Sequence, residues 1–176
     1  RYRAPEVLLQ ASVYSSAVDM WAMGAIIAEL FSHRPLFPGS SEADEIYKIC
    51  SILGTPNQHT WAAGLQLAAS IHFQFPQSGS ISLSEVVPTA SEDALNLISW
   101  LCSWDPRKRP TAVEVLQHPF FQVIIFPMSL HATLDYALIW FVNLTRIVYV
   151  TAMLLYPPFT SFQIDRICNN TTISWG

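Results

Sequence analysis

The stretch 17–31, which reads AVDMWAMGAIIAELF, constrains the fold more than any other part of the sequence. Among its fifteen residues only Asp19 and Glu29 are charged. A helix that is apolar on all sides is normally buried on all sides. We therefore expect a central helix over 17–31, ended by His33-Arg34-Pro35, with other elements packed around it.

Shorter helices joined by turn-rich loops are predicted after the central one. Apolar residues of 42–53 recur at the helical period and predict the next helix. Weak periodicity over 57–90 predicts a long, loosely structured insert with short helices around 60–69 and 82–87. An apolar stripe behind acidic opening residues predicts a helix over about 91–103, and a short helix is predicted from Thr111 to just before His118. Serines at cap positions support three of the helix starts: Ser15 or Ser16, Ser40 or Ser41, and Ser91. No segment of 1–122 alternates cleanly as a strand would, so the predicted fold class is all-α.

The composition changes abruptly near residue 122. The chain has 9 basic and 13 acidic residues, and only four of these 22 lie in 123–176, which contains no Lys and no Glu. Aliphatic and aromatic residues crowd this last part instead. We therefore expect two parts, a helical domain over 1–122 and an apolar tail of unknown structure over 123–176.

Net charge and cysteine usage exclude several classes of protein. A formal charge of −4 argues against a nucleic-acid partner, which needs a basic face. Three distant cysteines fit neither a disulfide scaffold nor a zinc site, and they favour a reducing compartment, cytoplasmic or nuclear. The chain begins with Arg inside a motif and has no signal-peptide pattern, so we expect it to be a fragment.

Three spaced motifs carry a resemblance to a known family. They are Tyr2-Arg3-Ala4-Pro5-Glu6, Asp19-Met20-Trp21-Ala22-Met23-Gly24, and Trp104-Asp105-Pro106 with Arg107-Lys108-Arg109-Pro110-Thr111. In order and separation they resemble the end of the activation segment and later helices of the protein kinase C-terminal lobe. The resemblance covers about residues 1–122.

Two further phrases narrow the resemblance to one group of kinases. Pro35-Leu-Phe-Pro-Gly39 and Leu53-Gly-Thr-Pro56, with the long insert after them, resemble the cyclin-dependent and MAP kinase group. Within that group the chain is most similar to plant kinases related to the male-germ-cell-associated type, including those called cyclin-dependent kinase F. The resemblance implies a Ser/Thr protein kinase, a transferase that phosphorylates proteins.

Glu6 is expected to point inward, because Pro5 precedes it and apolar residues follow. A buried carboxylate needs a cation, and the resemblance implies that this cation is Arg109. Alternatively, both side chains are ordinary exposed charges. The resemblance makes Ala4, Pro5, Glu6 and Arg109 structural motif residues.

Asp19, Trp21 and Gly24 are the other structural motif residues that the resemblance implies. In the family the matching Asp accepts backbone hydrogen bonds from the catalytic loop, a segment that these 176 residues do not contain. Asp19 could equally be a simple cap or a solvent-facing residue at the helix start.

Arg3 is the substrate-pocket residue that the resemblance implies. In the proline-directed kinases the matching arginine helps shape the pocket for the residue after the phosphoacceptor. The implied partner is therefore a protein substrate carrying Ser or Thr followed by Pro. Arg1 departs from the family pattern, in which most relatives carry an aromatic residue.

Phosphoryl transfer needs parts that these 176 residues lack. The sequence contains no glycine-rich GxGxxG loop, no HRD and no DFG, and its two lysines, Lys48 and Lys108, are not in a strand context. The family uses Mg-ATP. We expect no catalytic, cofactor-binding or metal-binding residue in this chain, and no phosphate transfer by the chain alone.

The tail allows three interpretations. Residues 136–156 are long enough to cross a bilayer, although Asn143 and Arg146 lie near the middle, where charge is costly. The tail could instead pack on the central helix, or be translated sequence that never belonged to the fold. Two other functions therefore compete with the kinase interpretation, a non-catalytic module that docks partners through 42–53 and 54–90, and a membrane-tethered fragment.

Overall fold

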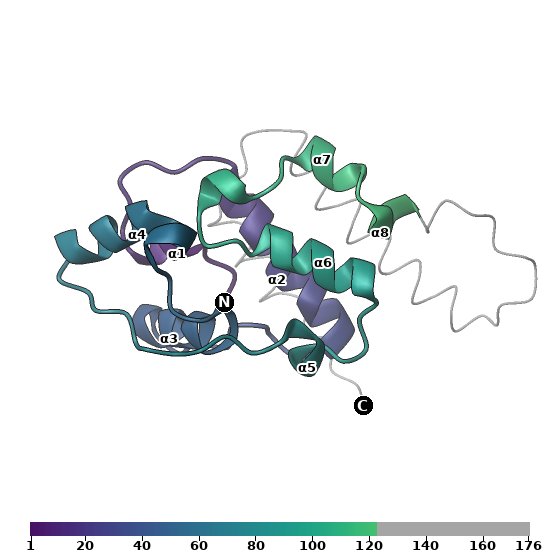
Figure 1. The fold of residues 1–176 in the computed structure, drawn as a ribbon, viewed down its shortest axis with the longest axis horizontal. Helices are drawn as coiled ribbons and strands as arrows, with labels where there is room; N and C mark the ends of the chain where they lie inside the picture. The colour runs from purple at the N-terminus through teal and green to yellow at the C-terminus, as the bar shows by residue number, and fades with distance from the viewer. Residues whose placement is uncertain (123–176) are drawn as a thin grey trace, which may run out of the picture. The chain divides into compact units, whose positions relative to one another are not determined.

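The structure is a computed structural model that describes residues 1–122. These residues form helices joined by loops (Figure 1), and within them the one extended pairing is a single bridge between Leu53 and Ser80. The all-α prediction is confirmed. The helices, in chain order, are α1 (Pro5–Leu8), α2 (Ala17–Ser32), α3 (Glu42–Leu53), α4 (Gln58–Ser70), α5 (Leu83–Val86), α6 (Glu92–Leu101), the short 3-10 helix η1 (Pro106–Lys108), α7 (Ala112–Leu116) and α8 (Pro119–Gln122).

Helix α2 is the centre of the described residues, and α6 packs along it (Figure 1). Its first half is buried without interruption from Met20 to Ala25. The expectation of burial on every side fails in the second half, where Ile26, Leu30 and Phe31 are only half-buried. The helix stops where the sequence predicts, because His33 takes the left-handed conformation, with φ 55° and ψ 22°, that ends many helices.

Serine hydroxyls accept hydrogen bonds at all three predicted helix starts, although at α2 the N-cap residue itself, Ser16, makes no side-chain cap bond. Ser41 Oγ accepts a hydrogen bond from the Asp44 N–H at 3.2 Å, and Ser91 Oγ accepts one from the Ala94 N–H at 3.3 Å. At α2 the donor is the Ala17 N–H and the acceptor is Ser15 Oγ, at 3.3 Å. Each hydroxyl satisfies a backbone donor that the first turn of a helix leaves free.

Helix α4 contains a kink that accounts for its weak sequence pattern. Trp61 has φ −162° and ψ 73°, an extended conformation inside the helix. Because one residue is extended, the residues after Trp61 point in different directions from those of a continuous helix, and the 3.6-residue repeat of apolar residues is interrupted. The kink carries the Trp61 ring onto the ring of Trp104, with centroids 5.8 Å apart and planes 22° apart. The residue therefore joins α4 to the segment after α6.

Residues 54–90 are tied to the end of α3 rather than loosely attached. Gly54 ends that helix with φ 78°, a value that side chains other than glycine rarely allow. Thr55 then accepts a hydrogen bond from the Ser78 N–H at 2.8 Å and donates one to the Pro76 carbonyl. These contacts hold both ends of the intervening segment together.

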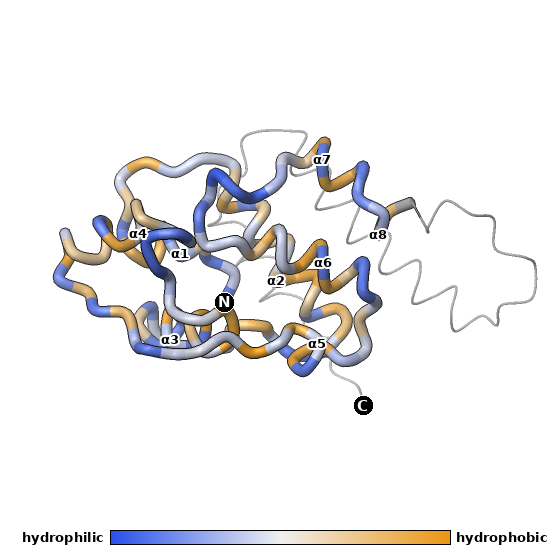
Figure 2. The backbone as a smooth tube through the Cα atoms, viewed as in Figure 1, coloured by the Kyte–Doolittle hydropathy of each residue, from blue (hydrophilic) through white to orange (hydrophobic). Residues whose placement is uncertain are grey.

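Hydropathy does not simply follow burial in this fold. Figure 2 draws the stretch between α6 and α7 as one of the most hydrophilic parts of the backbone, and this stretch contains Arg107, Lys108 and Arg109. Arg107 is largely exposed, whereas the Arg109 side chain is completely buried. The buried arginine therefore needs a specific set of partners.

The helices of residues 1–122 include none with the length and hydropathy needed to span a bilayer. The predicted span at 136–156, and with it the whole apolar tail over 123–176, lies outside the described residues.

Gly24 lies where α2 and the end of α6 approach closely, and its replacement tests this packing. A Cβ at Gly24 would lie 2.7 Å from Cys102 Sγ and 2.8 Å from Leu101 Cβ, too close without separating the helices. Overpacking of this kind outweighs the helix propensity gained by alanine, so we expect Gly24→Ala to lower the free energy of unfolding by about 1–2 kcal/mol.

The measurement is urea unfolding of the 176-residue chain followed by circular dichroism. Gly79→Ala is the matched control, because a Cβ at Gly79 would meet nothing within 4 Å. We expect this control to unfold like the wild type. Equal stability of Gly24→Ala and the wild type would contradict the close approach.

Candidate functional site: a buried ion pair that joins the motifs

Glu6 is buried at the start of the molecule, as the sequence predicts. It lies in the single turn of α1, where Pro5 occupies the first helical position and is suited to it by its fixed φ. Ala4, Leu8 and Leu9 around it are almost completely buried. With 5% of its surface exposed, Glu6 follows its apolar neighbours into the interior.

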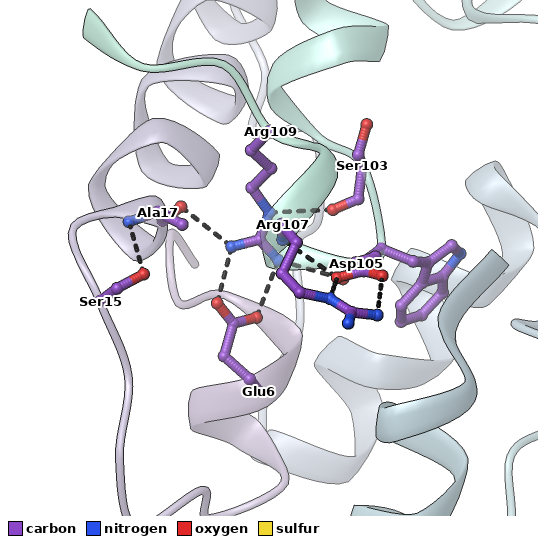
Figure 3. A network of polar contacts seen from close by, with 8 residues as sticks. Glu6, Ser15, Ala17, Ser103, Asp105, Arg107 and Arg109 are labelled. Carbon is purple, nitrogen blue, oxygen red and sulfur yellow. Dashed lines mark hydrogen bonds and ion pairs between the residues drawn. The ribbon is translucent and has the colours of Figure 1, made fainter.

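Arg109 meets this carboxylate from the other end of the domain (Figure 3). Its Nη1 lies 2.7 Å from Glu6 Oε1 and its Nη2 lies 2.8 Å from Glu6 Oε2. The two side chains form a parallel, bidentate ion pair, the strongest geometry for an arginine and a carboxylate. The alternative that both are ordinary exposed charges is wrong, since their side chains are only 0% and 7% exposed.

The remaining N–H groups of Arg109 donate to backbone carbonyls. Its Nε lies 2.9 Å from the Ser103 oxygen, Nη1 lies 2.9 Å from the Ala17 oxygen, and Nη2 lies 3.2 Å from the Trp104 oxygen. A guanidinium has five N–H donors in a fixed planar arrangement, and here each has an acceptor. The network therefore fixes α1, the start of α2 and the segment after α6 relative to one another.

Trp21 covers the face of the Arg109 guanidinium, with 5.0 Å between the Arg109 Cζ and the ring centroid. The same ring stacks on Phe37 at 5.4 Å and lies 6.4 Å from the ring of Trp104. A cation over an indole face is attracted by the π electrons, and desolvation strengthens this attraction. The motif residues Trp21 and Arg109 are thus parts of one packed unit.

Asp19 lies half-buried in the first turn of α2, and burial raises the pKa of its carboxyl group. Within residues 1–122 no hydrogen bond to this carboxylate is seen, and the backbone donor at the helix start goes to Ser15 instead. Its family role as an acceptor for the catalytic loop stays a prediction.

Arg3 lies apart from the buried pair, near the surface. Its Nη1 forms an ion pair with Glu42 Oε1, the first residue of α3, at 2.8 Å, and both side chains are about half exposed. An exposed pair of this kind contributes little to stability, about 0–1 kcal/mol. The predicted role of Arg3 in a substrate pocket stays a prediction.

The sequence reasoning missed a second ion pair beside the first. The buried Asp105 accepts hydrogen bonds from the Arg107 Nε at 3.0 Å and Nη2 at 2.8 Å (Figure 3). These bonds from Arg107 hold the pKa of the Asp105 carboxyl below its usual value. The sequence signal for this pair was the order Asp105-Pro106-Arg107. An aspartate two residues before an arginine can cap η1 by accepting from the Arg107 N–H and can also accept from the Arg107 side chain.

Two buried thiols, Cys50 and Cys102, are not suited to be nucleophiles. Burial raises the pKa of each to about 12, so neither forms a thiolate near neutral pH. Among the residues that the structure describes, no cluster of His, Cys, Asp or Glu could hold a metal ion. The geometry that the structure shows is a structural joint between motifs, made by the buried pair of Glu6 and Arg109.

Comparison of the sequence with known proteins gives a family match for the helical part of the chain. The sequence model of the family described as protein kinase domain matches residues 1–121. The chain is 62% identical to Cyclin-dependent kinase F-4 of Oryza sativa subsp. japonica over 125 residues. These aligned residues are 71% of this chain and 27% of the rice protein.

Two further similar proteins give the same result. Cyclin-dependent kinase F-3 of the same rice is 56% identical over 133 residues, which are 75% of this chain and 31% of that protein. The human Serine/threonine-protein kinase MAK is 55% identical over 132 residues, which are 74% of this chain and 21% of that protein. The chain thus spans less than a third of the length of these relatives.

Removing the Glu6 charge tests the joint. Glu6→Gln keeps the shape of the side chain but leaves the Arg109 charge buried and unpaired. We expect the free energy of unfolding to fall by about 3–5 kcal/mol, measured by urea unfolding.

Glu42→Gln is the matched control, because it removes the same charge from the exposed pair with Arg3. Its expected effect is within about 1 kcal/mol of wild type. If the two variants lost equal stability, the buried pair would not have the structural role described.

Proposed function

Since the chain belongs to the protein kinase domain family, we propose that residues 1–122 are the later part of the helical lobe of a proline-directed Ser/Thr protein kinase. The observation that carries the proposal is the bidentate pair of Glu6 and Arg109, which joins the first and last of the three motifs found in this chain in one buried network. A frame of this kind supports the segment before α1, where Arg3 lies.

The substrate-side surface is the part of the reaction that this chain would serve. Arg3 stands two positions before Pro5 and presents a half-exposed guanidinium beside α3. We propose that it shapes the pocket for the residue after the phosphoacceptor, so that Ser or Thr followed by Pro is preferred. The protein substrates would be met in the cytoplasm or the nucleus.

Mg-ATP does not fit the residues present. The 176 residues contain no glycine-rich GxGxxG motif, no HRD and no DFG. In protein kinases these motifs cover the ATP phosphates, supply the catalytic base and hold magnesium, respectively. We therefore propose that the chain by itself transfers no phosphate.

A chimera tests the proposal. Residues 1–122 replace the matching stretch of the rice Cyclin-dependent kinase F-4, and the product is assayed with Mg-ATP on Ser-Pro and Ser-Ala peptides. We expect phosphate transfer with a clear preference for Ser-Pro, and no transfer by the 176-residue chain alone.

Arg3→Ala in the chimera should reduce the preference for Ser-Pro, because the pocket loses its arginine. Arg34→Ala is the matched control, since it removes an exposed arginine from the loop just after α2 and should leave the preference unchanged. A folded chimera without activity would contradict the kinase proposal. An unchanged preference in Arg3→Ala would contradict only the role of Arg3.

A non-catalytic docking module is the second candidate function. Exposed apolar side chains favour it, because Tyr47 of α3 is 51% exposed, and Ile71 and Ile81 of the following segment are 36% and 45% exposed. The transcript upstream of residue 1 discriminates the two candidates. Codons for HRD and DFG there favour the enzyme, and their absence favours the module.

A further inference from the structure

Glu42 is the acidic residue that meets Arg3, and it lies on a different segment of the fold. Arg3 belongs to the segment before α1, whereas Glu42 is the first residue of α3. Arg3 Nη1 and Glu42 Oε1 are 2.8 Å apart, within hydrogen-bond distance. The pair therefore connects the residue proposed to shape the substrate pocket to the start of a helix 39 positions further along the chain.

The backbone that carries Glu42 is well anchored, although its side chain is about half exposed. Ser41 caps α3 by accepting a hydrogen bond from the Asp44 N–H at 3.2 Å. The N–H and the hydroxyl of Ser40 both donate to Asp44 Oδ2, at 2.8 and 3.0 Å. Helix α3 also contacts α1, which directly follows the segment of Arg3. Glu42 thus extends its carboxylate from a fixed helix start.

The contact with Glu42 engages one part of the Arg3 guanidinium and leaves the rest accessible. A guanidinium carries five N–H donors, on Nε, Nη1 and Nη2. Among the hydrogen bonds within residues 1–122, Nη1 donates to Glu42, and Nε and Nη2 donate to no other group. The Arg3 side chain is 46% exposed. Donors therefore remain for a group that arrives from solvent while Nη1 is held.

A tether on Arg3 affects binding more than folding. A free arginine side chain populates many rotamers and loses this freedom when it becomes part of a binding surface. A partner that restricts the side chain beforehand reduces the entropy lost on binding. An exposed ion pair contributes little to the free energy of unfolding. The consequence of this pair is therefore expected in substrate selection rather than in stability.

We propose that Glu42 is a positioning residue for substrate selection, which holds the Arg3 guanidinium at the start of α3 and thereby strengthens the preference for proline after the phosphoacceptor. The proposal rests on the proposed function, in which Arg3 shapes the pocket for that residue. It adds the first residue of α3 to the surface that selects the substrate.

The tether is tested in the 176-residue chain, apart from any kinase activity. The order parameter of the Arg3 Nε–H bond, obtained from nitrogen relaxation by NMR, reports motion of the side chain on the ps–ns timescale. We expect this order parameter to fall in Glu42→Gln, because the charged partner of the guanidinium is lost.

Glu92→Gln is the matched control for the tether. It removes an exposed carboxylate of α6 that forms no ion pair within residues 1–122. The Arg3 order parameter should then equal that of the wild type. An order parameter that is the same in the wild type, in Glu42→Gln and in Glu92→Gln would overturn the proposal.

Substrate selection is measured in the chimera with the rice kinase. We expect Glu42→Gln to lower kcat/KM for the Ser-Pro peptide by about two- to fivefold, the range that an exposed ion pair can provide. The value for the Ser-Ala peptide should not change. Damage to the fold would lower both values equally, so the ratio of the two separates positioning from misfolding. Glu92→Gln should leave both values unchanged.

A double-mutant cycle shows whether Glu42 acts through Arg3. In a chimera that already carries Arg3→Ala, Glu42→Gln should have no further effect on the ratio, because no guanidinium is left to hold. Equal effects of Glu42→Gln with and without Arg3, or an unchanged ratio in the single variant, would overturn the role of Glu42 alone. A wild-type chimera without activity would contradict the proposed function and the role of Glu42 together.

Discussion

The fold depends on one buried charge pair, Glu6 with Arg109, whose members are 103 positions apart in the sequence. A buried charge is tolerated only when it is paired and hydrogen-bonded, so the guanidinium requires all of its acceptors at once. These acceptors belong to α1, to Ala17 at the start of α2, and to the segment after α6. Three segments distant in sequence are therefore fixed by a single side chain, which joins the first and last of the three motifs in this chain.

Packing and polar contacts share residues in this structure. Trp104 accepts from Arg109 through its carbonyl, while its ring lies between those of Trp21 and Trp61. The aromatic stack thus links α2 to α4 through the same segment that holds the guanidinium. Gly24 lets α6 approach α2 closely enough for this arrangement. The frame that results connects α2, α4 and the segment after α6 through both polar and aromatic contacts.

Local features were predictable from the sequence, and long-range ones were not. The 3.6-residue repeat with the cap serines correctly predicted α3 and α6, and the uniformly apolar stretch after Ser15 and Ser16 correctly predicted α2, because these signals act within a few turns of helix. The partner of Glu6 came from the family resemblance, since no local pattern specifies a contact across the domain. The carbonyls around Arg109 are backbone atoms and leave no mark on the sequence. The kink at Trp61 disturbed the repeat of α4.

The most direct measurement of the central claim is NMR spectroscopy of the arginine side chains in the 176-residue chain. If Arg109 donates all of its N–H groups to fixed oxygens, rotation of its guanidinium is blocked and its Nε and Nη protons exchange slowly with water. We expect separate, slowly exchanging signals for each Nη proton of Arg109, beside a single averaged signal for the exposed Arg3. An averaged, rapidly exchanging signal for Arg109 as well would show that the guanidinium is free, and it would contradict the central role of the buried pair.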